Sequence, residues 1–129
     1  MTLSFSTTLR NARADAITSA VGNAGKLRIY DGTKPAAGGT ATTLLAEFTL
    51  GTPFDAAASS GGLTPNLPAD ATASATGTAT WFRIVTSGGT FVIDGTVGTS
   101  GSDINLVTTS IVSTQPVSIT SWTITEGNA

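Results

Sequence analysis

The chain of 129 residues contains no histidine and no cysteine, and it has only six basic and eight acidic side chains. Without histidine it lacks the side chain that most often exchanges protons near neutral pH. Without cysteine it has no thiolate nucleophile, no disulfide and no sulfur ligand for zinc or an iron–sulfur cluster. We therefore expect a protein that acts by holding a shape and not by catalysis.

Long hydrophobic runs are missing as well. No uninterrupted apolar stretch approaches the roughly 18 residues of a membrane-spanning helix. Residues 1–16 have no basic segment followed by an apolar one, so we expect no secretory signal. The basic residues are too sparse for a nucleic-acid site. We expect neither a membrane nor a nucleic acid as partner.

Threonine and glycine are abundant, with 25 and 15 residues. The apolar content of 40% argues against disorder, and the length suits one domain over residues 1–129. Threonine favours extended backbone and makes the outer faces of sheets polar without charging them. Such faces are easier to bury against a partner than faces of lysine or glutamate.

Charge is divided unevenly along the chain. Residues 1–34 carry five basic and two acidic side chains, and residues 35–129 carry one basic and six acidic ones, which gives +3 and −5. Complementary fields steer association, so copies packed head to tail or as a dimer would bring the two regions together. The alternative is an ordinary solvated surface.

One helix is predicted, over residues 7–21. Its apolar residues recur at helical spacing and form a stripe that we expect to face the body. Ser6 or Thr7 can cap its start, and Gly22 can end it. The stripe is mostly alanine, so the helix needs a sheet or a partner to lie on. Its members are Leu9, Ala12, Ala16, Ile17, Ala20 and Val21.

After Gly25 the hydrophobic period changes to two, which is typical of strands. Alternating runs separated by turn signals indicate seven or eight short strands. This pattern favours an all-β fold, a jelly-roll-like β-sandwich with one N-terminal α-helix. In the last run, residues 117–125, the buried phase changes from odd to even positions. We therefore expect a β-bulge near Thr120 and Ser121.

Residues 51–77 form a long stretch with three prolines and little periodicity. Loops of this length are uncommon in compact domains. Phe54, Leu63 and Leu67 can anchor it to the body or to a neighbouring subunit, and a loosely ordered loop is the alternative. Its last part, residues 70–76, alternates in the manner of a strand.

Few residues suggest chemistry. Asp94 and Asp103 flank a Gly/Ser loop of the oxygen-rich kind that binds calcium. No glutamate closes that site, however, and we favour aspartates that cap turns. A glycosidase-like carboxylate pair, or a Ser–Lys dyad with Lys26 or Lys34, has no supporting motif. We therefore predict no catalytic residue, no cofactor and no metal site.

Trp81, Arg83 and Val85 share one face of the predicted strand over residues 78–86, opposite the residues that face the core. A Trp–Arg row on an outer sheet face is typical of an interface hot spot. Alternatively, the helix or a second sheet covers the row. In that case Arg83 needs a buried or half-buried carboxylate partner.

Five stretches of the chain, taken in order, resemble a family of small tailed-bacteriophage virion proteins, the capsid cement (decoration) proteins. The resemblance implies a jelly-roll-like β-sandwich that binds the outside of the phage head, often as a dimer or trimer over joints between capsomers. It brings no catalytic motif and no transferable interface residue. The stretches are SFSTTLRNARADAIT (4–18), GKLRIYDGTKPA (25–36), LLAEF (44–48), GTATWFRI (77–84) and DGTVGTSGSDINL (94–106).

The resemblance implies a structural virion protein, made in the bacterial host cytoplasm and located on the capsid exterior. Its partners would be the major capsid protein and further copies of itself, as a dimer in preference to a trimer. The helix and residues 51–77 are the expected contact elements. One alternative is a carbohydrate-binding module, head fibre or tail-associated protein, with Trp81, Trp122 or Tyr30 as a sugar platform. Another is a hydrolase with two carboxylates.

Overall fold

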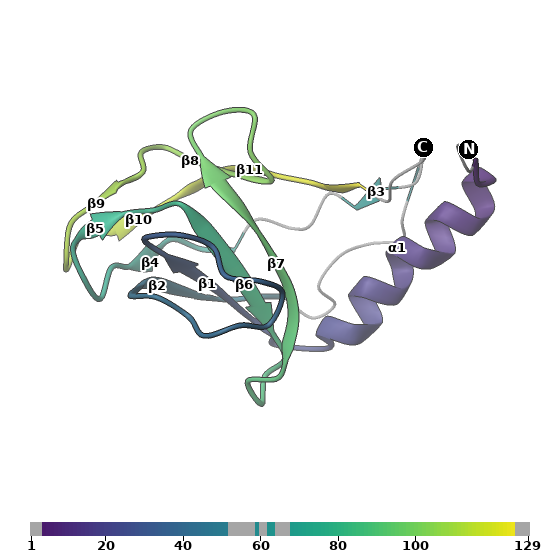
Figure 1. The fold of residues 1–129 in the computed structure, drawn as a ribbon, viewed down its shortest axis with the longest axis horizontal. Helices are drawn as coiled ribbons and strands as arrows, with labels where there is room; N and C mark the ends of the chain where they lie inside the picture. Colours follow the sequence, from purple (N-terminus) through teal and green to yellow (C-terminus); the bar gives the residue numbers. More distant parts are fainter. Residues whose placement is uncertain (1–3, 52–58, 60–61, 64–67, 126–129) are drawn as a thin grey trace.

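The computed structural model describes residues 4–51, 59, 62–63 and 68–125. One helix, α1 (Thr7–Val21), extends from one end of a curled body of short strands (Figure 1). In this described part of the chain, the mostly β body with one N-terminal helix agrees with the all-β class expected from the sequence. No helix within the described ranges is both long and apolar enough to cross a membrane.

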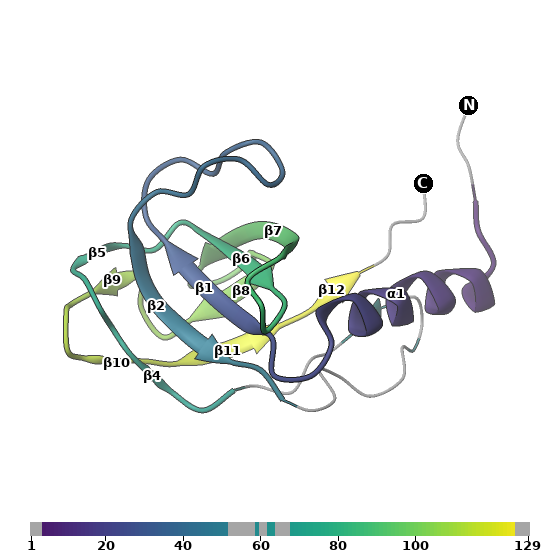
Figure 2. The same ribbon diagram turned by 90° about the horizontal axis from the view of Figure 1, so that it is seen from below.

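The largest sheet has six strands in the order β11-β8-β7-β6-β1-β2. Its neighbours are antiparallel except β7 and β8, which are parallel. The sheet curls on itself (Figure 2). Its members are β1 (Lys26–Tyr30), β2 (Leu44–Thr49), β6 (Trp81–Val85), β7 (Phe91–Gly98), β8 (Ile104–Leu106) and β11 (Ile119–Trp122).

Within the described residues, three two-stranded antiparallel pairs accompany this sheet. The expected number of seven or eight strands is wrong, because turns and bulges cut the predicted runs into shorter pieces. The last run alone yields β10, β11 and β12. The pairs are β4 (Ala71–Thr72) with β10 (Pro116–Val117), β3 (Gly62–Leu63) with β12 (Ile124–Thr125), and β5 (Gly77–Thr78) with β9 (Ser110–Ile111).

The predicted bounds of α1 are confirmed. The Ser6 hydroxyl accepts a hydrogen bond from the Leu9 N–H at 3.1 Å, which caps the start of the helix. Gly22 ends it with a φ of 70°, a conformation that favours glycine. Only four residues, 22–25, separate α1 from β1. A Cβ on the last of them, Gly25, would lie 2.7 Å from Val21 Cγ1, so the helix is joined closely to the sheet.

The predicted buried stripe of α1 is confirmed only at Ile17 and Val21. The side against the body carries Ala14 and Val21, which are buried, and Ile17, which is half-buried. The close junction with β1 fixes the rotation of the helix, and alanines gain too little from burial to reverse it. Four members of the predicted stripe are therefore exposed, namely Leu9, Ala12, Ala16 and Ala20.

The expected bulge in the last run is confirmed. Ile119 pairs with Leu106 and Ser121 with Asn105, so the register shifts across Thr120. The shift lets both Ile119 and Trp122 face the core. Trp122 packs edge-on against Phe82, with ring centroids 6.4 Å apart.

Part of the stretch 51–77 belongs to the body. Leu63, one of its predicted anchors, is 2% exposed, and its strand β3 pairs with β12. The strand expected near its end exists as β4. The other two anchors, Phe54 and Leu67, lie outside the described residues.

Candidate functional site

Four charged side chains form a row across the six-stranded sheet. The register places Glu47 opposite Arg28, Arg28 opposite Arg83, and Arg83 opposite Asp94. Arg28 Nε donates to Glu47 Oε2 and Arg83 Nε donates to Asp94 Oδ1, both at 2.7 Å. Each arginine therefore has a carboxylate on its far side, which offsets the repulsion between the two guanidinium groups. These hydrogen bonds raise the pKa of both arginines.

The loop between β1 and β2, residues 31–43, covers one half of this row. Arg83 Nη2 donates to the Gly39 carbonyl at 2.8 Å, and the Gly38 N–H donates to Asp94 Oδ2 at 3.2 Å. The Arg83 and Asp94 side chains are only 11% and 2% exposed. The ion pair thus holds the loop against the sheet.

The Trp81 side chain holds the two ends of the same loop. Its indole N–H lies 2.9 Å from the Asp31 carbonyl and 3.0 Å from Thr42 Oγ1, and donates to both. Its ring stacks on Tyr30 with centroids 4.4 Å apart. The Arg83 guanidinium lies 5.2 Å from the centre of the Trp81 ring, within cation–π range.

The Trp81–Arg83–Val85 row is therefore internal, with exposures of 0%, 9% and 2%. Of the two interpretations left open by the sequence, burial is the correct one. The expected carboxylate partner is Asp94. Over Trp81 and Arg83 the cover is the β1–β2 loop, because hydrogen bonds join both side chains to this loop.

The three aromatic residues considered for a sugar platform do not form one. Trp81, Trp122 and Tyr30 are 0%, 2% and 5% exposed. A stacking platform presents a ring face to solvent, and none of these rings does so.

Asp94 and Asp103 have structural hydrogen bonds. Asp103 Oδ2 accepts from the Thr96 N–H at 2.9 Å and from its hydroxyl at 3.0 Å, in addition to the Asp94 contacts described above. Both residues line a 160 Å³ cavity with Phe82 and Gly95. Within the described part of the chain, no three acidic side chains lie close enough together to hold a metal ion.

The lysines considered for a Ser–Lys dyad do not line this cavity. Lys26 Nζ donates to Thr49 Oγ1 at 2.9 Å on the surface of the sheet. Lys34 is exposed in the β1–β2 loop.

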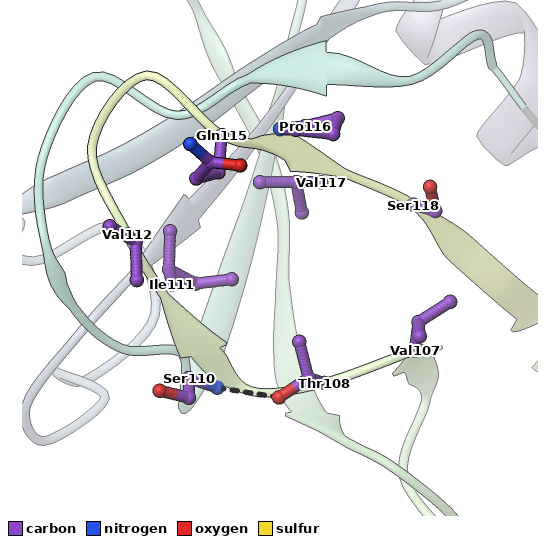
Figure 3. A pocket seen from close by; sticks show the side chains of 9 residues that line it. All are labelled: Val107, Thr108, Ser110, Ile111, Val112, Gln115, Pro116, Val117 and Ser118. Carbon is purple, nitrogen blue, oxygen red and sulfur yellow. Dashed lines mark hydrogen bonds between the residues drawn. The ribbon is translucent and has the colours of Figure 1, made fainter.

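A larger apolar groove, the β9–β10 groove, lies at the end of the body. It has a volume of about 360 Å³ and is formed by the segment after β8, by β9 and by β10 with its flanking residues. Figure 3 shows side chains from these segments surrounding one space. Its lining residues are Val107, Thr108, Ser110, Ile111, Val112, Gln115, Pro116, Val117 and Ser118.

The groove has an apolar floor, and its exposed edge carries two valines together with uncharged polar groups. Ile111 and Val117 are 4% and 3% exposed, whereas Val107 and Val112 are 67% and 51% exposed. The polar members carry hydroxyl or amide groups, and no lining residue is charged. The volume lies in the range of ligand sites, and its lining suits an uncharged, largely apolar partner.

Sequence reasoning missed this groove, although the sequence contains a signal for it. Apolar residues occur there as adjacent pairs, Leu106-Val107 and Ile111-Val112. Neighbouring strand residues point to opposite faces, so burial of Leu106 and Ile111 leaves the second member of each pair exposed. Two adjacent apolar residues in a strand with one buried face therefore predict that one of the two is an apolar side chain on the surface.

Comparison with known proteins gives no family for this chain: no protein-family model, curated protein or solved structure matches it. The described part of the chain is a β-rich body from which one helix projects. Its buried charged pair serves packing, and its apolar groove is open.

Proposed function

We propose that this protein is a structural virion protein, a capsid cement (decoration) protein that binds the outside of a phage head and bridges capsid subunits. In this proposal it is made in the bacterial host cytoplasm, resides on the capsid exterior and has no catalytic role. Its partners are the major capsid protein and further copies of itself.

The distribution of polar and apolar groups carries this proposal. The buried ion pair and Asp103 are engaged inside the fold, while apolar side chains remain at the surface. The exposed large apolar residues within the described ranges are Leu9, Phe91, Val107 and Val112. Exposed apolar side chains on a weakly charged surface suit contact with other proteins.

We propose further that the body is a distorted jelly-roll-like β-sandwich. Pairing of β1 with β6, across more than forty residues, supports a sheet built from distant segments. The parallel pairing of β7 with β8 differs from a purely antiparallel sandwich, which is why we call the body distorted.

The proposed mechanism is cumulative binding. Each contact is modest, but an oligomer engages several capsid sites at once and gains from effective concentration. A protein that binds only the expanded shell stabilises it by about 2.7 kcal/mol per site at a concentration one hundred times Kd.

Capsid binding tests the proposal. Purified protein is mixed with expanded phage heads that lack it, and the pelleted heads are assayed for bound protein and for the temperature of disruption. We expect saturable binding and a higher disruption temperature, with unexpanded shells as the control. A clean monomer that fails to bind expanded heads would remove the cement role. Binding to glycans without binding to heads would favour the carbohydrate-binding alternative.

A further inference from the structure

We propose that copies of this protein associate by a helix-in-groove contact, in which the first turns of α1 of one copy lie in the β9–β10 groove of the next. This inference goes beyond the proposed function, because association of the purified protein requires no capsid.

The two surfaces lie at opposite ends of the molecule. In Figure 1 the longest axis is horizontal, with α1 at one end and the strands β9 and β10 at the other. Helix and groove of one copy therefore cannot meet within that copy. They can meet only between copies.

The two surfaces match in shape and polarity. The exposed stripe of α1 presents one large apolar side chain, Leu9, which is 45% exposed, followed by three alanines. Alanines let a helix backbone approach a partner closely. The groove offers an apolar floor at Ile111 and Val117 and has no charged group that would have to be desolvated.

The charges around the two surfaces are complementary. Arg10 and Arg13 lie beside Leu9 on α1. At the other end, the exposed Asp70 directly precedes β4, the partner strand of β10, which forms a wall of the groove. The contact brings the basic N-terminal region of one copy toward the acidic remainder of another, which favours encounter in this orientation.

This contact joins two different surfaces. Repeating it gives a closed ring or an open chain. The smallest closed arrangement has two copies lying antiparallel, with each helix in the groove of the other copy.

Two charge variants test the contact by sedimentation equilibrium of the full chain. Leu9→Glu disrupts the helix side, and an acidic residue in the first turn of a helix is compatible with folding. Val112→Glu disrupts the groove side at a half-exposed position. The wild type is expected to associate at micromolar concentration, and each variant to weaken association at least tenfold, which corresponds to about 1.4 kcal/mol.

Two matched control variants introduce the same glutamate charge close to the proposed contact, at residues that do not take part in it. Thr8→Glu lies in the same turn of α1, outside the stripe, and Thr109→Glu lies between two groove residues without lining the groove. Both controls are expected to associate like the wild type. Unchanged circular dichroism and melting temperature confirm that each variant is folded.

Mixing the two variants separates this contact from its alternatives. Leu9→Glu keeps an intact groove and Val112→Glu keeps an intact helix, so a mixed pair has one unmodified contact. An equimolar mixture is therefore expected to associate more tightly than either variant alone, although more weakly than the wild type. A contact between two helices, or between two grooves, would not be restored in the mixture. A monomeric wild type, or a mixture that stays monomeric, would overturn the inference while leaving capsid binding to be judged by its own assay.

Discussion

The two ion pairs in the charged row are equally short but differ in their surroundings. Arg28–Glu47 and Arg83–Asp94 both have a 2.7 Å Nε–O contact and occupy neighbouring positions on the same sheet. The side chains of the first pair are 31% and 39% exposed, whereas those of the second are 11% and 2% exposed. The β1–β2 loop covers only the second pair.

The N–O distance of an ion pair alone therefore does not determine how much the pair contributes to stability. In the open pair, water screens the attraction and can replace either partner. In the covered pair, both charges have lost most of their water, and each depends on the other. Arg28–Glu47 is thus a contact on the protein surface, whereas Arg83–Asp94 holds the β1–β2 loop against the sheet.

The largest effect is expected from removing the charge of the covered carboxylate. Asp94→Asn leaves the Arg83 charge buried without a counter-ion, so we expect the free energy of unfolding to fall by roughly 3 kcal/mol, the lower end of the range for broken buried pairs. Urea denaturation followed by tryptophan fluorescence measures the loss. Asp70→Asn, at an exposed aspartate, is the control and should change stability little.

A double variant sharpens this result. Arg83→Met combined with Asp94→Leu removes both charges and keeps apolar volume, so we expect it to be more stable than Asp94→Asn alone. The Gly38 amide loses its acceptor at Asp94 in the double variant, and its hydrogen exchange should accelerate. A double variant as unstable as the single one would mean that packing, and not the unpaired charge, sets the cost.

A smaller effect is expected on the inner side of the same strand. In Gly95→Ala, the new Cβ would lie 2.4 Å from Phe82 Cε1, and Phe82 is only 1% exposed. Overpacking of this kind costs roughly 1–3 kcal/mol, measured by the same urea denaturation. Gly88→Ala is the matched control, because its nearest neighbour would be the Thr86 hydroxyl at 3.8 Å. Equal stability of the two variants would contradict the close packing around Phe82.

Local features of this fold could be predicted from the sequence. The bounds of α1, its Ser6 cap and the bulge at Thr120 follow from capping chemistry and from a change of hydrophobic phase, which are properties of a few adjacent residues. The rotation of α1 could not be predicted. It depends on the junction at Gly25, and the alanine stripe carries too little hydrophobic free energy to orient the helix.

The site was less predictable than the fold. The need of Arg83 for a carboxylate follows from charge burial alone, but the identity of Asp94 requires the register between β6 and β7. The covering loop, residues 31–43, has no hydrophobic period to reveal that it folds back on the sheet. It is held by backbone groups such as the Gly39 carbonyl, which every sequence possesses, so composition gives no signal for them.

The smallest effect is expected at the open pair. Glu47→Gln removes the same kind of charge as Asp94→Asn and keeps the shape of the side chain, but Arg28 stays hydrated. We therefore expect a loss of about 0.5 kcal/mol or less by urea denaturation, and 1 M NaCl should abolish the difference from the wild type, because salt screens exposed charges. The loss in Asp94→Asn should persist in the same salt. If Glu47→Gln cost as much as Asp94→Asn, the cover provided by the β1–β2 loop would not be what distinguishes the two pairs.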